Sequence, residues 1–132
     1  MTQATTEQFL KTWHQMVDNR DLTLLDQLIA EDTTLLSPIF HSAKPGKPLM
    51  MLVLSTVIEI FEDFHYTGEW VQGNELILEF KAHIGDKHLK GIDRITLNDA
   101  GQMTELEVLV RPLNTLIVFA EEMRKRLALQ PA

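Results

Sequence analysis

The sequence contains no cysteine, which excludes disulfide bonds, cysteine-ligated zinc and thiol nucleophiles. It also lacks a long apolar run. The longest, LMMLVL at 49–54, is far shorter than the roughly 20 residues that a membrane-spanning helix needs. The N-terminal segment has no basic stretch followed by an apolar one, so it does not have the pattern of a signal peptide. These absences predict a soluble, cytoplasmic protein with no membrane partner.

Basic residues are also scarce: the sequence has 12 lysines and arginines against 19 acidic residues, which gives a formal net charge of −7. Binding to nucleic acid requires a basic surface, so nucleic acid is excluded as a partner. The five histidines show no HExxH motif or other tight ligand spacing. We therefore expect neither a metal site nor a cofactor.

The composition is that of a globular protein, with 45% apolar and 23% charged residues, and 132 residues fit one domain spanning 1–132. Apolar residues recur at helical spacing in the first 30 residues, where Asp21 is placed to cap a second, short helix. The segment PLMMLVLSTVIEIFEDF, 48–64, predicts a largely buried third helix. NTLIVFAEEMRKRLA, 114–128, predicts a last one.

Between these last two helices the apolar period changes to two. Four strand candidates follow one another across short turn signals. They are DFHYTGEWVQ, NELILEFKAHIG, KHLKGIDRITLN and QMTELEVLVRP. Such short turns predict antiparallel neighbours, and the order of elements predicts an α+β fold with helices packed on one face of the sheet. A short extended piece, TTLLSPIF at 33–40, precedes the third helix, and Pro38 limits it to an edge or a bend.

Residue alternation places a carboxylate on the apolar side of this sheet. In GIDRITL, Asp93 has the parity of Ile95 and Leu97, whereas Arg94 has the opposite parity. In the neighbouring strands, the apolar parity includes Phe80 and the pair Val108 and Val110, so Asp93 is expected beneath the helices. A buried carboxylate is costly unless it is protonated or hydrogen-bonded. Asp93 either accepts hydrogen bonds from a nearby loop or helix start, or lines a pocket between helices and sheet.

The order of elements resembles the nuclear transport factor 2-like fold, and its SnoaL-like group in particular. The resemblance rests on AEDTTLLSP after the second helix and on the strand-turn-strand segment 91–111. It implies a cone-like, strongly curved antiparallel sheet wrapped over the N-terminal helices, with an apolar pocket, and a homodimer made through the outer sheet face. The fold hosts isomerases, cyclases and binding proteins, so it does not determine the activity.

Ketosteroid isomerase is the nearest catalytic comparison within that resemblance. It pairs an Asp base with an oxyanion hole made of a Tyr and a protonated Asp. Asp93 matches the oxyanion-hole Asp, while Trp13 stands in the place of the Tyr and Ser37 in the place of the base. A tryptophan donates one N–H but does not exchange that proton as a phenol does, and a serine without a neighbouring base is a poor proton acceptor. The match is therefore incomplete.

Two histidines are candidates to assist Asp93 in proton transfer, although a capping or surface role is open for each. His41 lies in the loop after the first strand, and His65 begins the first long strand. The candidate binding residues share an apolar or pocket-facing position: Trp13, Ser37, Phe61, Phe80, Val108 and Val110. The remaining aromatic residues, Tyr66 included, are assigned to the core or to an interface.

The sequence thus predicts an apolar pocket that binds a small hydrophobic, carbonyl-bearing molecule. Proton transfer by Asp93, of the isomerase or cyclase kind, is the enzymatic hypothesis. The alternative is a non-catalytic dimeric module in which Asp93 only ties a strand to a loop.

Overall fold

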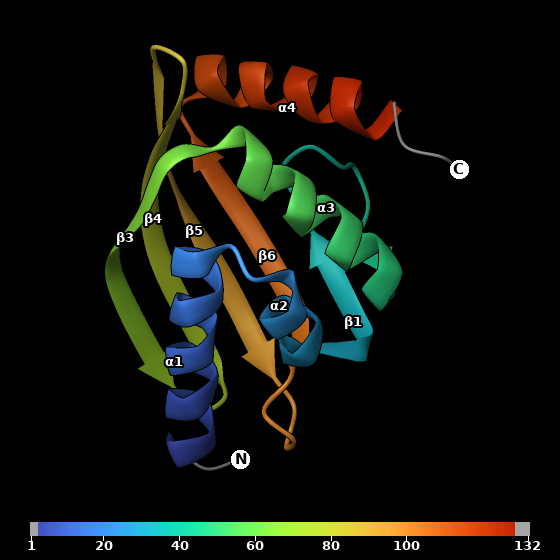
Figure 1. Ribbon diagram of the computed structural model, residues 1–132, viewed down its shortest axis with the longest axis vertical. Coiled ribbons are helices and arrows are strands. Elements are labelled where there is room, and N and C mark those ends of the chain that lie inside the picture. Colours follow the sequence, from blue (N-terminus) through green and yellow to red (C-terminus); the bar gives the residue numbers. More distant parts are fainter. Residues whose placement is uncertain (1–2, 129–132) are drawn as a thin grey trace.

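The computed structural model describes residues 3–128 and has the predicted order of helices, strands and a last helix (Figure 1). The elements are α1 (Gln3–Asn19), α2 (Leu22–Leu28), β1 (Ile29–Leu36), β2 (Lys44–Pro45), α3 (Lys47–Ile60), β3 (Glu62–Gln72), β4 (Glu75–Ile84), β5 (Lys87–Leu97), β6 (Met103–Arg111) and α4 (Leu113–Ala128). The α+β prediction is confirmed. The third helix is shorter than predicted, because Phe61 is already extended and β3 begins at once.

The six strands form one curved sheet in the order β2-β1-β6-β5-β4-β3. The four strands β3 to β6 are a meander of antiparallel neighbours, as predicted. The curved sheet is mixed rather than purely antiparallel, because β1 pairs in parallel with β6. These two strands are not joined by a hairpin, since α3 and four strands lie between them in the chain, and a parallel pair needs such a long connection.

The helices lie on the concave side and at one end of the sheet. In Figure 1, α1 and α3 lie in front of the strands, and α4 runs across the upper end. Asp21 caps α2 as predicted, since its carboxylate accepts from the backbone N–H groups of Thr23 and Leu24 at 3.0 and 3.2 Å. No helix within residues 3–128 is both long and apolar enough to cross a bilayer.

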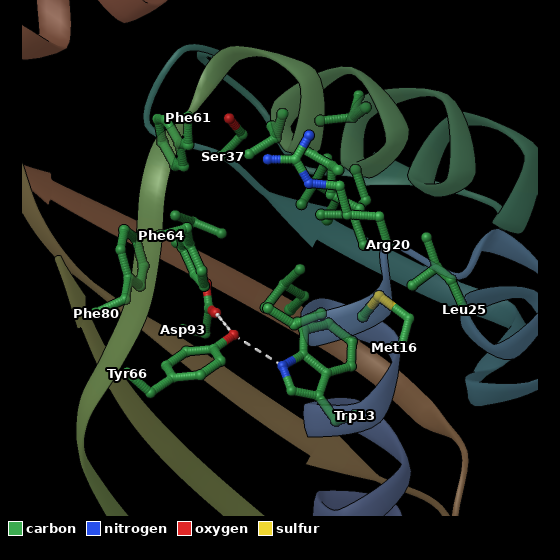
Figure 2. A pocket seen from close by; sticks show the side chains of 18 of the residues that line it. Trp13, Met16, Arg20, Leu25, Ser37, Phe61, Phe64, Tyr66, Phe80 and Asp93 are labelled. Carbon is green, nitrogen blue, oxygen red and sulfur yellow. Dashed lines mark hydrogen bonds between the residues drawn. The ribbon is translucent and has the colours of Figure 1, made fainter. Parts of the chain in front are cut away.

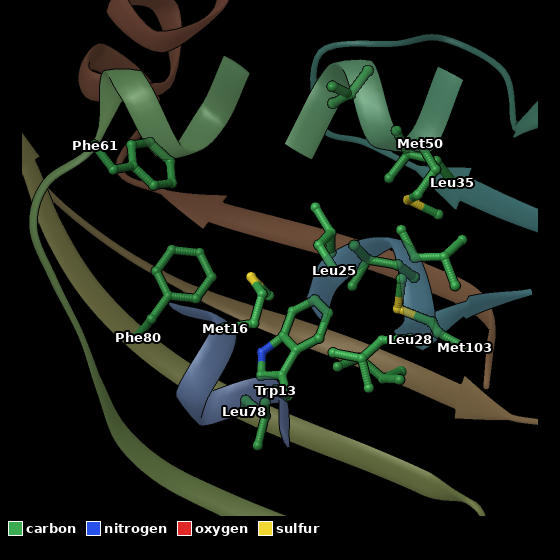
Figure 3. Close-up of a cluster of buried hydrophobic side chains, with 14 of the residues drawn as sticks. Trp13, Met16, Leu25, Leu28, Leu35, Met50, Phe61, Leu78, Phe80 and Met103 are labelled. Atoms are coloured by element: carbon green, nitrogen blue, oxygen red, sulfur yellow. The ribbon is translucent and has the colours of Figure 1, made fainter. Parts of the chain in front are cut away.

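The inward and outward faces of the meander are those that alternation predicts. Leu78, Asp93 and Val108 are direct neighbours across β4, β5 and β6. Leu78 and Asp93 are buried, whereas Arg94 faces outward and pairs with Glu75 at 3.1 Å. The inward face packs against the helices in one apolar cluster (Figure 3). Asp93 is therefore a carboxyl group set among core residues.

Candidate functional site

A cavity of about 290 Å³ lies between the concave face of the sheet and the helices (Figure 2). Its wall is mainly apolar and comes from every helix and from β1 and β3 to β6. An aromatic cluster forms one side: the rings of Phe61 and Phe119 lie 4.9 Å apart, as do those of Phe64 and Phe80. Binding pockets for small organic molecules typically have such an apolar wall with few polar groups.

Three side chains form a hydrogen-bond chain inside this cavity. The Trp13 Nε1–H donates to the Tyr66 hydroxyl at 2.8 Å, and that hydroxyl donates to Asp93 Oδ2 at 2.9 Å (Figure 2). These hydrogen bonds link α1, β3 and β5. Trp13 and Tyr66 are 53 positions apart in the sequence, and Tyr66 and Asp93 are 27 positions apart. Asp93 is thus hydrogen-bonded by a side chain, and it also lines the cavity.

Burial controls the protonation of this group. Only 7% of Asp93 is exposed, and its removal from water raises the pKa of the carboxyl from 3.8 to about 7, although the hydrogen bond from Tyr66 lowers it. Burial also raises the pKa of Tyr66 well above its usual value, and the negative charge on Asp93 raises it further. At neutral pH the phenol is therefore protonated, and Asp93 is present in both forms.

Side chains of β3 alternate between its two faces, and this alternation points Tyr66 into the cavity, although the register of the strand is irregular. Phe64 and Tyr66 face inward, while His65 and Thr67 are exposed. The pairing of β3 with β4 shifts between Glu62 and His65, and again after Tyr66. Bulges of this kind bend a strand and increase its twist. They set the curvature with which β3 passes α1.

Most of the predicted binding residues line the cavity beside Asp93: Trp13, Ser37, Phe61, Phe80 and Val108. Val110 does not. It is partly buried against the core and borders a separate shallow hollow, together with His41. Ser37 lies beside Pro38 after the end of β1, where its hydroxyl oxygen accepts from the Ile39 N–H at 3.3 Å. The structure thus brings together one predicted catalytic residue and five of the six predicted binding residues.

The two histidines proposed to assist Asp93 are not at the cavity, so that part of the prediction is wrong. His41 is exposed in the loop after β1. His65 is exposed on the outer parity of β3, and its Nδ1 lies 2.9 Å from the carbonyl oxygen of Asp63. No histidine within the described part of the chain lines the cavity, and no metal-binding group of histidine and acidic side chains is present there.

Sequence reasoning missed the closest partner of Asp93. Tyr66 is the only tyrosine of the chain, and it follows Phe64 by two residues in an alternating strand. That alternation is the signal that was available for its inward position. Three charged residues at the cavity, Asp18, Arg20 and Asp63, were also missed, because turn-like and acidic segments carry no pattern that points inward.

No protein-family model matches the chain, and no curated protein matches it. Solved structures do. A steroid delta-isomerase from Pseudomonas aeruginosa is 38% identical with a TM-score of 0.92, over 96% of this chain and 93% of that chain. An uncharacterised bacterial protein with a cystatin-like fold from Silicibacter pomeroyi is 30% identical with a TM-score of 0.84, over 90% and 86% of the two chains. An NTF2-like protein of unknown function from Mesorhizobium loti, 16% identical with a TM-score of 0.73 over 83% and 93%, shares the fold.

Proposed function

The chain belongs to the nuclear transport factor 2-like, ketosteroid isomerase-like superfamily, and on this premise we propose that it binds a small, largely apolar molecule through one carbonyl or enol oxygen. Tyr66 and Asp93 hold that oxygen. The observation that carries the proposal is the pair of adjacent hydroxyl and carboxyl groups, 2.9 Å apart, inside a mainly apolar cavity.

The proposed binding uses the protonated form of Asp93. When the carboxyl carries its proton, both it and the Tyr66 hydroxyl are donors, so a ligand oxygen can accept from each. The Tyr66 oxygen accepts from the Trp13 N–H, and its own proton, which is donated to Asp93 Oδ2 in the structure, turns to the ligand oxygen when the ligand binds. Hydrogen bonds in a water-poor cavity strengthen as negative charge develops on the ligand oxygen. The site therefore favours enols, phenols and polarised ketones.

Isothermal titration calorimetry with 2-naphthol tests the binding. The matched variant is Tyr66→Phe/Asp93→Leu, which keeps the shapes of both side chains and removes both donors. We expect 2-naphthol to bind the wild type about tenfold more tightly than this double variant, as loss of about one strong hydrogen bond implies. Asp86→Asn, in the exposed β4–β5 turn, is the charge control and should bind like the wild type. Equal affinity of the wild type and the double variant would exclude the proposal.

A second candidate function, isomerisation of an unsaturated ketone, is favoured by the 38% identity with a steroid delta-isomerase. Ionised Asp93 would take a proton from the carbon beside the carbonyl, the electron pair would move to the oxygen held by Tyr66, and the proton would return to the γ carbon. A base with a pKa of about 7 suits this step at neutral pH. Ser37 stands in the place of the catalytic base but has no carboxylate. Asp93 is the buried acidic residue of the cavity and takes the role of the base in this hypothesis.

The isomerisation is tested with cyclohex-3-en-1-one and with a 3-oxo-Δ5 steroid, by the ultraviolet absorbance of the conjugated product. Base catalysis predicts a rate that rises with pH through about 7 and that Asp93→Asn abolishes. If no conjugated product forms faster with the wild type than with Asp93→Asn, the function is binding alone.

We also propose a homodimer formed through the outer face of the sheet. One transverse row of that face is basic and runs in register across four strands: His65, Lys81, Lys90 and Arg111. Toward the other end, Glu75 and Glu105 flank Thr96 in another row. Exposed apolar side chains, such as Leu109, lie between them. A second copy turned by a two-fold axis would place basic rows opposite acidic ones, which supports self-association.

A further inference from the structure

Arg20 is a charged residue at the opening of the cavity. Its side chain is exposed and lines the cavity, and Figure 2 shows its guanidinium on the side remote from the Trp13–Tyr66–Asp93 chain. Within the described residues this guanidinium makes no ion pair and no hydrogen bond to another side chain or to the backbone. An unpaired cation beside an apolar cavity is therefore available to a ligand.

The backbone of Arg20 has a conformation that favours glycine. Its φ is +50°, in the left-handed region, at the residue that follows α1. The Arg20 N–H donates to Val17 O at 3.3 Å and the Asp21 N–H donates to Met16 O at 3.0 Å, which closes the helix end. Glycine is the usual residue at such a position and asparagine is the next best tolerated. The chain carries arginine here despite this strain, so the side chain is not explained by local structure.

The surroundings of Arg20 supply a second polar donor. Ser37 lines the same cavity, and Figure 2 shows its hydroxyl on the same side as the guanidinium. The Ser37 oxygen accepts from Ile39, and its own hydrogen is not donated to any group among residues 3–128. A hydroxyl and a guanidinium together suit a carboxylate, whose two oxygens accept from both.

Two acidic residues also line the cavity and bear on this argument. Asp18 and Asp63 are both exposed, and neither carboxylate forms an ion pair with Arg20. Each also borders a shallow hollow outside the cavity. Their charges weaken the attraction of an anion to the opening through solvent, and this effect is screened by salt. The attraction between the guanidinium and an anion in direct contact with it is screened less.

We propose that the ligand carries a carboxylate at the end remote from its carbonyl or enol oxygen, and that Arg20, assisted by Ser37, binds this carboxylate. The substrate class is then an apolar oxo or hydroxy acid. This inference rests on the proposed function, in which Tyr66 and Asp93 hold the other end. The apolar wall between the two ends accepts the hydrocarbon body.

Matched acids and esters test the proposal by calorimetry. The probes are 4-hydroxybenzoate, 6-hydroxy-2-naphthoate and 4′-hydroxybiphenyl-4-carboxylate, each against its methyl ester, with 2-naphthol as the probe that lacks the acid. The three probes differ in the distance between hydroxyl and carboxylate, so the test does not assume how far apart the two ends of the site lie. For the length that fits, we expect the wild type to bind the acid about tenfold more tightly than the ester, the effect of one hydrogen-bonded charge.

The variants Arg20→Gly and Arg20→Asn separate the ligand contact from folding, since both residues accept the backbone of position 20. Both should unfold at the same temperature as the wild type or higher, and both should bind acid and ester equally. Arg124→Gln, an exposed arginine of α4 away from the cavity, should keep the preference for the acid.

Three outcomes decide the matter. A preference for the acid that disappears in both Arg20 variants supports the proposal. Equal binding of acid and ester at every length, or a preference that Arg20→Gly keeps, overturns it while 2-naphthol binding still supports the proposed function. Failure of all the phenols, esters and 2-naphthol included, to bind the wild type overturns both.

Discussion

Asp93 is a carboxyl group in the core, and its position was predictable from single residues. Alternation in β4, β5 and β6 gave its inward parity, because side chains in a regular strand point to opposite faces in turn. Its partner Tyr66 was not predictable in the same way. Alternation in β3 indicates that Tyr66 points inward but not that it reaches Asp93, because register shifts interrupt the pairing of β3 and the Trp13 donor lies 53 residues earlier in the chain. Contacts of that range are set by packing, which no local pattern encodes.

Asp93 makes the stability of the protein depend on pH. Its pKa rises from 3.8 to about 7 on folding, so between these values the native state holds a proton that the unfolded state has lost. Stability contributed by this group is therefore full below about pH 4 and falls until about pH 7. In the variant Asp93→Asn this loss is absent. We expect the wild type to lose up to about 4 kcal/mol relative to the variant between pH 4 and 7.5.

Urea unfolding of both proteins at a series of pH values measures this difference, since other titrating groups contribute equally to both. A difference in unfolding free energy that stays constant across the range would show that Asp93 ionises in the native state as it does in water.

Tyr66 lowers the pKa of Asp93 by donating a hydrogen bond to the ionised form. The variant Tyr66→Phe removes that bond, so the pKa of Asp93 should rise above its value in the wild type. Carbon-13 NMR of the aspartate carboxyl groups during a pH titration measures it. The control is Thr67→Val, an exposed neighbour on the opposite face of β3, which should leave the titration unchanged. A fall in the pKa of Asp93 in the Phe variant would contradict the hydrogen-bond assignment.

At the scale of elements, the sequence predicted what is local and missed what is not. Short turn signals gave the order and pairing of β3 to β6, since hairpins join neighbours. The parallel pairing of β1 with β6 had no such signal, because these strands are far apart in the chain. The early end of α3 was missed as well. The apolar run continues through Phe61 and Phe64. Phenylalanine is compatible with a strand as well as with a helix, so the pattern does not indicate where the helix ends.

Gly91 shows how tightly β5 packs against the cavity wall. A Cβ at this position would lie 2.5 Å from the Leu109 carbonyl oxygen and 2.5 Å from the ring of Phe80. The backbone oxygen belongs to the neighbouring strand, and Phe80 is buried and lines the cavity. We expect Gly91→Ala to destabilise the fold by about 3 kcal/mol, as overpacking does, and to weaken 2-naphthol binding.

The matched control is Gly85→Ala, whose added Cβ meets nothing within 4 Å but whose φ is +60°. It should cost only about 1 kcal/mol of backbone strain in urea unfolding, with 2-naphthol affinity unchanged. If both variants lost the same stability, steric contact at Gly91 would not be the cause.

On the outer face of the sheet, basic side chains form one row and acidic side chains another. The net charge of the whole molecule is −7. Like charges in register, such as Lys81 opposite Lys90, destabilise an isolated sheet. Glu79 lies 3.5 Å from Lys90, but Lys81 has no ion pair within the described residues. The proposed dimer would relieve this repulsion by placing acidic side chains of a second copy over the row.

Charge reversal tests that arrangement of two copies. Lys81→Glu and Glu105→Lys each place like charges across the proposed interface, so each should weaken dimerisation, most strongly at low salt where screening is least. The double variant restores opposite charges and should dimerise again, which a merely structural effect of either substitution would not produce. Sedimentation velocity at 0.05 and 0.5 M NaCl measures all four proteins. A wild type that stays monomeric at both salt concentrations, or a double variant no better than the single ones, would mean that the outer face does not pair in this orientation.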